Sequence, residues 1–522
     1  MEKRKYPVGI QSFEKIRKDD YLYVDKTRLL YDLTHEGTYY FLSRPRRFGK
    51  SLLVNTLKCY FEGKRELFEG LAIAELETEW TQYPVMRFDF SGGKYETREQ
   101  LEEYISYTLG EMEQQYGLSQ KKLHINQRFA NLVRAAHEKT GRQVVVLIDE
   151  YDAPMLFHIE NETSQDDIRI AMRNLFSPLK SLDDHLRFVF FTGITKFSQM
   201  SVFSELNNLN NISMLPQYDA ICGISEEELT TVMRLDIEEL ARSIGKSDEE
   251  TVDMLKTRYD GYHFSENLTD IYNPFSLLNT FNNKKLKDYW FGTGTPSFLI
   301  KVLRKYQMKE TDFEGMRCLI DRFDKPVEHI TDPIPVLYQS GYLTIKGYQT
   351  IGEVYTLGFP NLEVRRGFFN SLLDYTVPQT IDSRGYLYLA YLDLWQGGDF
   401  APFVETIKAF YASIPYELEG RGKVDEHYYH SLLYALLMAF GAEVKAESSS
   451  SRGRADLVLL MPQNIYIMEL KLDATAAEAL QQIDVKGYAQ PYLADGRKVV
   501  KVGINFGSKE RNITEWMEKD EK

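Results

Sequence analysis

The chain has few cysteines and no long apolar segment, and both absences restrict where it can work. Three cysteines occur among 522 residues, Cys59, Cys222 and Cys318, far apart and without CxxC pairs or histidines at zinc-ligand spacing. No apolar run approaches the roughly 18 residues that suggest a membrane span, and the start, MEKRKYPVGI, lacks the apolar core of a signal peptide. We therefore expect a cytoplasmic protein without disulfides, structural zinc or membrane segments.

The chain also lacks an excess of positive charge. Its 63 lysines and arginines are outnumbered by 77 acidic residues, and the net charge is −14. Because duplex binding normally depends on clustered lysine and arginine that neutralise phosphates, any nucleic-acid site must be local. The length, the 43% apolar fraction and the absence of low-complexity tracts predict two to four folded domains.

A phosphate-binding loop is predicted near the N-terminus. The β-prone run 38–43 is followed by RPRRFGKS, residues 44–51, and then by SLLVNTLKCYF, which has helical periodicity. In such a context loop amides bind phosphate, the lysine reaches the β and γ oxygens, and the hydroxyl binds Mg²⁺. Arg44 replaces the first glycine of the usual pattern, so the loop must begin with ordinary φ values. The alternative is a basic surface turn. The candidate nucleotide-binding residues are Arg46, Arg47, Phe48, Gly49, Lys50, Ser51 and Leu52, and Ser51 is also a candidate magnesium ligand.

Two acidic residues follow a run typical of a buried parallel strand. Residues 144–148 are all apolar and directly precede Asp149 and Glu150. Because α/β folds hold ligands at the carboxyl ends of their strands, Asp149 is predicted to face Mg²⁺ and Glu150 an attacking water. A helix cap or a solvated turn is the alternative. A further strand, LRFVFFTGITKFS, ends in Thr192 and Thr195, and either could sense the γ-phosphate or the attacking water. The alternative is that threonine is simply favoured at strand ends. With the strand expected over 83–91, a mostly parallel sheet covered on both faces is predicted.

The middle of the chain is predicted to be a connector. Helical patterns follow residue 223, and an apolar helix-like run then precedes two β-prone pieces, YLTI and VYTL. This order is compatible with a winged helix, which can bind DNA but in multidomain ATPases more often packs as a lid or oligomer contact. The expected domains are 1–222, 223–420 and 421–522.

The last hundred residues predict a second site. A helix, a polar turn, an apolar strand that begins at Asp456, a second apolar strand and a final helix are expected. Glu469 and Lys471 stand two apart on the second strand, so they share one face. Two carboxylates and an amine suit Mg²⁺-assisted phosphodiester hydrolysis. The alternatives are ordinary charges at strand ends or a decayed core that only binds. His427 and His430 lie one helical turn apart, but no third transition-metal ligand lies nearby.

The N-terminal motifs together resemble a known family. YPVGIQSFEKIR, YVDKT, SRPRRFGKS, LIDEYDAP, TGITKFSQMSVFSELNNLNNIS, YDGYHFS and IYNPFSLLN are similar to bacterial AAA-ATPase-like proteins over roughly residues 5–290, and that family also lacks the first glycine of the loop. The resemblance implies that Gly49, Lys50 and Ser51 bind nucleotide and that Asp149 and Glu150 form the second acidic motif. It also implies a frequent fusion to a C-terminal PD-(D/E)XK domain.

The C-terminal segment resembles that nuclease superfamily. The spacing D-x12-E-x-K, with GRADLVLL and YIMELKL, carries the resemblance. It implies that Asp456 and Glu469 are metal ligands and that Lys471 supports the attacking water. The auxiliary residues implied are Glu426 as an additional acid, and Gln482 and Tyr488 of the QxxxxxY pattern.

We therefore expect an α/β chain with a P-loop parallel sheet, a helical and winged-helix-like connector and a restriction-endonuclease-like C-terminal domain. The expected function is ATP hydrolysis, with Mg²⁺, coupled to a Mg²⁺-dependent nuclease that acts on nucleic acid, with DNA the favoured substrate. The alternative is a nucleotide-operated switch or binding protein that does not cut. A homo-oligomer is compatible with the sequence, and Arg46 and Arg47 are candidates for an arginine finger.

Overall fold

The computed structural model describes residues 4–119, 122–158, 161–196, 209–290, 313–326, 332–376, 381–414, 426–450 and 453–521. The chain divides into two compact units, one of residues 1–306 and 314–363 and the other of residues 307–313 and 364–522. The predicted domain boundaries at residues 222 and 420 stay predictions, and residue 420 lies outside the described residues. Residues 197–208 of the TGITKFSQMSVFSELNNLNNIS motif also lie outside them. None of the helices in the described ranges is long and apolar enough to cross a membrane.

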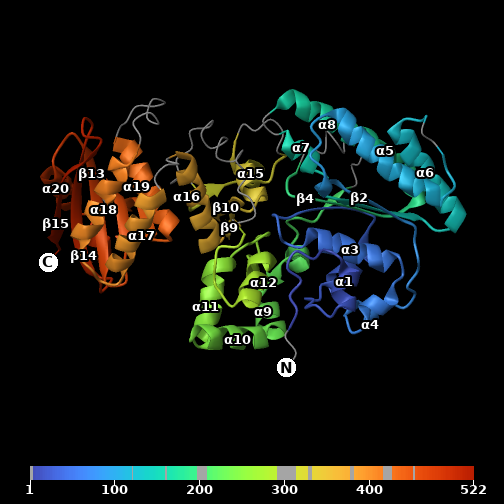
Figure 1. Ribbon diagram of the computed structural model, residues 1–522, viewed down its shortest axis with the longest axis horizontal. Helices are drawn as coiled ribbons and strands as arrows, with labels where there is room; N and C mark the ends of the chain where they lie inside the picture. The colour runs from blue at the N-terminus through green and yellow to red at the C-terminus, as the bar shows by residue number, and fades with distance from the viewer. Residues whose placement is uncertain are drawn as a thin grey trace. The chain divides into compact units, whose positions relative to one another are not determined.

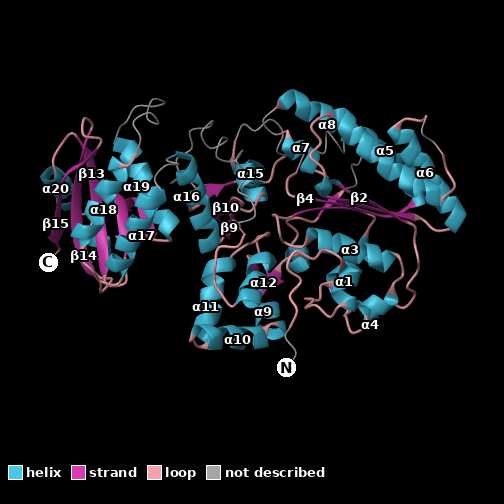
Figure 2. Ribbon diagram, in the orientation of Figure 1, coloured by secondary structure: helices cyan, strands magenta, loops and turns pink. Residues whose placement is uncertain are grey.

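A five-stranded parallel sheet forms the centre of the first unit (Figures 1 and 2). Its order is β2-β3-β4-β1-β5, and every neighbouring pair runs parallel, which confirms the predicted sheet. All six residues of β3 are buried, as expected where both faces of a sheet are covered. The strands are β1 (Tyr39–Ser43), β2 (Val85–Asp89), β3 (Val144–Asp149), β4 (Leu186–Gly193) and β5 (Asn210–Asn211).

Helices cover both faces of this sheet. Figure 1 shows α5, α6 and α8 on one side and α1, α3 and α4 on the other. Phe129, Leu132, Val133 and Ala136 of α6 are buried at helical spacing, so this stripe packs into the apolar core against the sheet. The helices are α1 (Phe13–Lys18), α2 (Thr27–Glu36), α3 (Lys50–Phe61), α4 (Ile73–Leu76), α5 (Arg98–Gln115), α6 (Ile125–Thr140), α7 (Ala153–Phe157) and α8 (Glu162–Phe176). Four 3-10 segments accompany them, Arg65–Phe68, Phe90–Gly92, Ser177–His185 and Pro216–Ile221.

The rest of the first unit contains a helical group and a small antiparallel sheet. The helical group includes the two-stranded sheet β6–β7. In the second group, the predicted helix and two strands are α15, β9 and β10, and β8 is a third strand that pairs with β10. The elements of the helical group are β6 (Ile224–Ser225), α9 (Glu226–Val232), α10 (Arg234–Ile244), α11 (Asp248–Tyr259), β7 (Ile271–Tyr272) and α12 (Pro274–Asn283). The elements of the second group are β8 (Met316–Cys318), α14 (Ile320–Phe323), α15 (Ile334–Gln339), β9 (Thr344–Gln349) and β10 (Val354–Gly358).

The second unit is built on a mixed five-stranded sheet of order β11-β12-β13-β14-β15. Only β13 and β14 pair in parallel among these strands, and α20 connects them, as a parallel crossover requires. The boundary between the units falls inside α16 (Leu362–Thr376). The other helices are α17 (Ile381–Trp395), α18 (Phe400–Ala412), α19 (Glu426–Phe440) and α20 (Ala476–Lys486), with a 3-10 segment at Gln490–Tyr492. The strands are β11 (Glu443–Ser450), β12 (Gly453–Leu460), β13 (Asn464–Leu472), β14 (Lys498–Gly507) and β15 (Asn512–Asp520).

Two sequence predictions for this unit are wrong. A polar turn was expected between the helix and the first strand, but this segment contains the edge strand β11, because a polar segment can pair along one side of a sheet without entering the core. Asp456 was expected to begin a strand but is the fourth residue of β12, since backbone pairing with β11 extends the strand back to Gly453.

Candidate nucleotide and metal sites

The predicted phosphate loop connects β1 to the N-terminus of α3. Gly49 is the residue before the helix and has a φ of +98°, a conformation that only glycine adopts without strain. Lys50 is buried, and its Nζ donates hydrogen bonds to the carbonyl oxygens of Arg44 (2.8 Å) and Pro45 (3.0 Å) in the same loop. Ser51 follows in the first helical turn. A helix N-terminus, an amine and a hydroxyl are therefore brought together, which is the combination that binds a phosphate chain.

Arg44, in place of the usual glycine, anchors the loop from within the protein. Its guanidinium is buried, donates to the carbonyl oxygens of Ser213 (2.7 Å) and Tyr218 (3.0 Å), and lies 4.0 Å over the ring of Phe264. Arg44 is not among the residues with a positive φ, in keeping with the expectation of ordinary backbone values there. The arginine thus supplies charged hydrogen bonds and stacking where a glycine would supply neither.

The other loop residues divide between the interior and the surface. The ring of Phe48 is buried against Tyr262, with ring centroids 4.8 Å apart, and its carbonyl accepts a hydrogen bond from the Gly223 amide (3.0 Å). These contacts tie Phe48 to the helical group that packs against the loop. Arg46 and Arg47 are exposed, and the φ of Arg47 is +69°.

The carboxyl end of β3 holds the predicted acids beside the loop. Asp149 is fully buried; its Oδ1 accepts from the Thr192 hydroxyl (2.9 Å), and a guanidinium nitrogen of Arg87 lies 3.4 Å from its Oδ2. Glu150 has a φ of +50°, an uncommon conformation for a residue with a side chain. Burial lowers the pKa of Lys50, while the nearby charges of Glu150, Asp152 and Asp149 raise it. Burial also raises the pKa of Glu150. The amine and these carboxylates therefore interact electrostatically at one sheet edge.

Asp152 belongs to this edge and was missed by sequence reasoning. Its Oδ2 accepts from the amides of Ile194 (2.9 Å) and Thr195 (2.7 Å) and from the Thr195 hydroxyl (2.8 Å). A Cβ on Gly193 would lie 2.5 Å from Asp152 Oδ1, so only glycine allows this close approach. The signal in the sequence was the third acid of LIDEYDAP. Thr192 and Thr195 thus have different partners, Asp149 and Asp152 respectively.

An apolar pocket lies beside the loop. It encloses about 680 Å³ of space, part of it open to solvent. Gly49 and Leu52 contribute to its wall, and Lys26, whose Nζ lies 2.5 Å from Glu228, is the charged residue at its edge. Its other walls come from the N-terminal segment and the helical group, including Tyr23, Val24, Ile224 and Pro274. The pocket can take a flat apolar group next to the phosphate loop.

In the second unit, the predicted acids and amine come together on β12 and β13. Asp456 Oδ2 accepts a hydrogen bond from the Leu470 amide (2.8 Å), which places it beside Glu469. Lys471 Nζ donates to Glu469 Oε1 (2.9 Å), and Gln482 of α20 donates to the same oxygen. The Tyr488 hydroxyl lies 3.5 Å from Gln482 Nε2.

The environment of Glu469 fits a metal ligand. The residue is 1% exposed, and its Oε2 is buried without a hydrogen-bond partner. Burial, together with the charge of Asp456, raises the pKa of Glu469 to about 7, although Lys471 acts in the opposite direction. A buried carboxylate oxygen without a donor is costly unless a cation satisfies it. The oxygens of Glu469 and Asp456 therefore suit a hard divalent cation.

The remaining predicted residues of this site lie at its margin. Glu426, the first residue of α19, is exposed, and its charge helps to raise the pKa of Lys471. Glu426, Asp456 and Glu469 do not form a group of three ligand atoms within 4.8 Å of one another in the described part of the chain, so Glu426 does not join the other two acids. His430 Nε2 lies 2.9 Å from the Asp456 carbonyl oxygen, so this ring contacts β12 through that nitrogen.

Comparisons with known proteins identify a family for each end of the chain. Residues 7–203 match the family model described as "Predicted AAA-ATPase", and residues 424–516 match the PD-(D/E)XK nuclease superfamily. A relative from Azotobacter chroococcum mcd 1, described as "Uncharacterized protein in vnfD 5'region", is 37% identical over 527 residues, which cover 98% of each chain. The chain belongs to the AAA-ATPase-like family and carries a C-terminal domain of the PD-(D/E)XK nuclease superfamily, so the predicted resemblance is confirmed.

Proposed function

We propose that this protein binds and hydrolyses ATP in its first unit and that nucleotide state controls a metal-dependent phosphodiesterase in its second unit. The substrate proposed is nucleic acid, with DNA favoured, and the place of action is the cytoplasm. The observation that carries the proposal is the buried, unpartnered Oε2 of Glu469 beside Asp456 and Lys471. Such an oxygen is expensive to retain in a fold that does not bind a cation.

The ATPase half rests on the residues around the phosphate loop. Lys50 reaches the β and γ oxygens, Ser51 and Asp149 hold Mg²⁺, and Glu150 orients the attacking water. A bound Mg²⁺ supplies charge neutralisation for the phosphates. Thr192 holds Asp149 in place through its 2.9 Å hydrogen bond. The apolar pocket beside Gly49 and Leu52 accommodates the nucleobase. Arg46 and Arg47 are exposed and remain the candidates for contacts with phosphate from a second subunit.

The nuclease half rests on β12, β13 and α20. Asp456 and Glu469 would hold Mg²⁺, which would supply positive charge beside the attacking water and the scissile phosphate. Lys471 orients the water and offsets negative charge as it develops. Gln482 fixes the Glu469 carboxylate, and Tyr488 lies behind Gln482. Glu426 is the auxiliary acid at the exposed edge.

A cleavage assay tests the proposal. Full-length protein is incubated with single-stranded DNA, duplex DNA and RNA in Mg²⁺ or Mn²⁺, with ATP, with ADP and without nucleotide. We expect cleavage that Asp456→Ala removes and that changes at least severalfold with ATP in the wild type but not in Lys50→Ala. Saturable binding of nucleic acid without metal-dependent cleavage would instead support the alternative of a binding switch that does not cut.

A further inference from the structure

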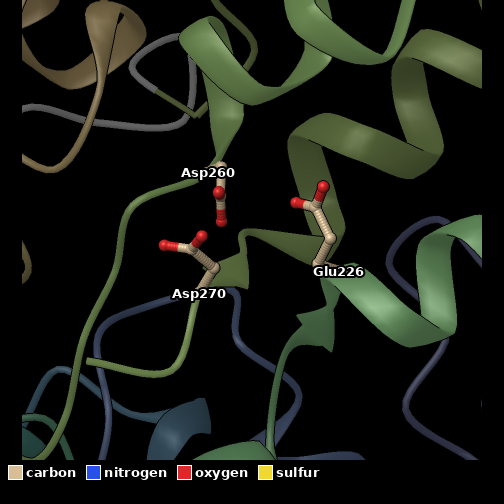
Figure 3. A group of neighbouring side chains, drawn as sticks. All are labelled: Glu226, Asp260 and Asp270. Carbon is tan, nitrogen blue, oxygen red and sulfur yellow. The ribbon is translucent and has the colours of Figure 1, made fainter. Parts of the chain in front are cut away.

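Three carboxylates that belong to neither site described above gather in the helical group of the first unit. They belong to Glu226 at the start of α9, Asp260 at the C-terminus of α11 and Asp270 next to β7 (Figure 3). One oxygen from each lies within 4.8 Å of the other two. Figure 3 shows the three side chains turned toward the same space. Acidic residues converge in this way at the cost of mutual repulsion, so the arrangement requires a compensating charge.

Lys256 provides only part of that charge. Its Nζ lies 3.1 Å from Asp270 Oδ2 and 3.3 Å from Glu226 Oε2. It is 3.9 Å from Asp260 Oδ2, beyond hydrogen-bonding distance. The lysine side chain is 46% exposed, so it can move to solvent at little cost.

The environment of the Asp260 carboxylate points to a ligand. The residue is 2% exposed, and its Oδ1 is buried with no hydrogen-bond partner. The Gly261 amide lies near the carboxyl and lowers its pKa, but burial prevails and raises the pKa of Asp260 to about 7. By contrast, Glu226 accepts a hydrogen bond from the Tyr272 hydroxyl (2.8 Å), and Asp270 Oδ1 lies 2.7 Å from His263 Nε2. The one buried carboxylate of the group therefore also has an oxygen without a hydrogen-bond partner.

We propose that Glu226, Asp260 and Asp270 bind a hard divalent cation of the Ca²⁺ or Mg²⁺ class, and that this cation displaces the Lys256 ammonium. All three groups offer carboxylate oxygens, the ligands that such cations prefer. Oxygens up to 4.8 Å apart can surround an ion bound at about 2.3–2.6 Å, the range of Ca²⁺, while a smaller ion requires a slight contraction. The proposal does not depend on ATP hydrolysis or on cleavage of nucleic acid.

The cation would connect the helical group to the phosphate loop. Glu226 and Asp270 flank the β6–β7 pair, and Gly223, just before β6, donates its amide to the Phe48 carbonyl in the loop. Asp260 is followed by Tyr262, whose ring packs edge-to-face on Phe48. A bound cation would therefore hold together the two segments, around Gly223 and Tyr262, that contact Phe48 of the loop.

Cation titration of nucleotide-free, full-length protein tests the site. The Asp149→Ala, Asp456→Ala double variant serves as the background, because it lacks an acid in each of the other two candidate metal sites. We expect one saturable site for Ca²⁺, Mg²⁺ or Mn²⁺ by calorimetry, and a rise in the first unfolding midpoint of roughly 5–10 °C at a hundred times the dissociation constant. Asp270→Asn should weaken binding at least tenfold, whereas Glu249→Gln, an exposed acid on α11, should not. A background protein that binds none of the three cations, or that binds them equally well with Asp270→Asn, overturns the proposal.

Lys256→Gln gives an independent measurement if the acidic variants fail to fold. Removal of the competing ammonium should tighten cation binding at least threefold, because the cation no longer has to displace a charge. If the three acids and Lys256 form only an internal ion cluster, Lys256→Gln should destabilise the protein and no cation should restore it. That result, or an unchanged affinity, contradicts the proposal.

Discussion

The Thr192 hydroxyl donates a 2.9 Å hydrogen bond to Asp149 Oδ1 between the ends of two adjacent parallel strands, β4 and β3. Both residues are fully buried. Thr192→Val keeps the shape of the side chain but leaves this carboxylate oxygen without its donor. We expect ATP turnover to fall by roughly tenfold or more, equivalent to about 1.4 kcal/mol in the barrier, with a smaller change in nucleotide affinity. Thr192→Ser retains the hydroxyl and should keep most of the activity; equal loss in both variants would argue against a positioning role.

Lys50 and Glu150 should separate binding from hydrolysis. Lys50→Ala should abolish ATP turnover and leave the fold intact, because the amine acts as a point charge on phosphate and bonds only to carbonyl oxygens of its own loop. Glu150→Gln should bind ATP with near wild-type affinity but hydrolyse it at least 100-fold more slowly, since the amide cannot accept the proton from water as the carboxylate does. Fluorescent nucleotide binding and phosphate release measure the two quantities. Wild-type turnover in Lys50→Ala would refute the loop assignment.

Arg44→Gly restores the common loop pattern and should nevertheless destabilise the protein. The change removes two charged hydrogen bonds to buried carbonyl oxygens and the stacking on Phe264. We expect the free energy of unfolding of the first unit to fall by roughly 3–5 kcal/mol. Arg46→Gly, at an exposed position two residues on, is the matched control and should cost less than about 1 kcal/mol. Urea denaturation compares the two, and similar losses would show that the anchoring is not specific to Arg44.

Substitutions at the C-terminal site should reduce cleavage in two different ways, by loss of the metal or by loss of rate with the metal still bound. Asp456→Ala and Glu469→Ala should each eliminate metal-dependent cleavage and leave ATPase activity in place, because a cation held by two carboxylates loses much of its affinity when one is removed. Lys471→Ala should still bind Mn²⁺ but cleave at least 100-fold more slowly, since the amine is not a ligand. Calorimetric Mn²⁺ binding distinguishes these classes. If folded Lys471→Ala protein did not bind Mn²⁺, the assignment of Lys471 as a residue that is not a metal ligand would be refuted.

Glu363 should make stability depend on pH. It is 1% exposed, and burial raises its pKa from the ordinary 4.5 to about 7, although the Trp290 amide and the Ser276 hydroxyl donate to its carboxyl group. Because the fold favours the neutral acid, its contribution is fully present below pH 4.5 and is lost as the pH rises through 7. Glu363→Gln resembles the neutral form at every pH. The variant should therefore match the wild type near pH 5 and exceed its stability by up to roughly 3 kcal/mol at pH 8.

Urea unfolding at several pH values between 5 and 9 measures this difference. Glu249→Gln is the control, since that side chain is exposed and its replacement should not change the pH dependence. A constant offset between Glu363→Gln and the wild type across the range would show that Glu363 does not titrate in the folded protein.

The parts of the fold that could be predicted from the sequence are those coded by contiguous residues. The loop at 44–51, the apolar run of β3 and the pair Glu469 and Lys471, two apart on one strand, place their side chains through local geometry. The partners of Arg44 could not be predicted, because Ser213 and Tyr218 follow it by 169 and 174 residues and contribute only backbone carbonyl oxygens, which every residue possesses.

Two further features escaped prediction for the same physical reason. β11 has a polar sequence, and only its pairing with β12 makes it a strand. The acids Glu226, Asp260 and Asp270 are ordinary surface types at three separate positions, and only the pairing of β6 with β7 and the end of α11 bring them together. Such groups depend on tertiary contacts and leave no periodic or spacing signal in the chain.

The position of the Arg44 anchors has a consequence for synthesis on the ribosome. The loop is translated early, but the carbonyl oxygens that hold its first residue belong to Ser213 and Tyr218. At about 5–20 residues per second, these acceptors follow Arg44 by roughly 10–35 s. During that interval the nascent chain carries β1 and α3 without the contacts that shape the turn between them. We therefore expect nascent chains to acquire nucleotide affinity in a single late step, after Tyr218 has left the exit tunnel, and not gradually as the first strands emerge.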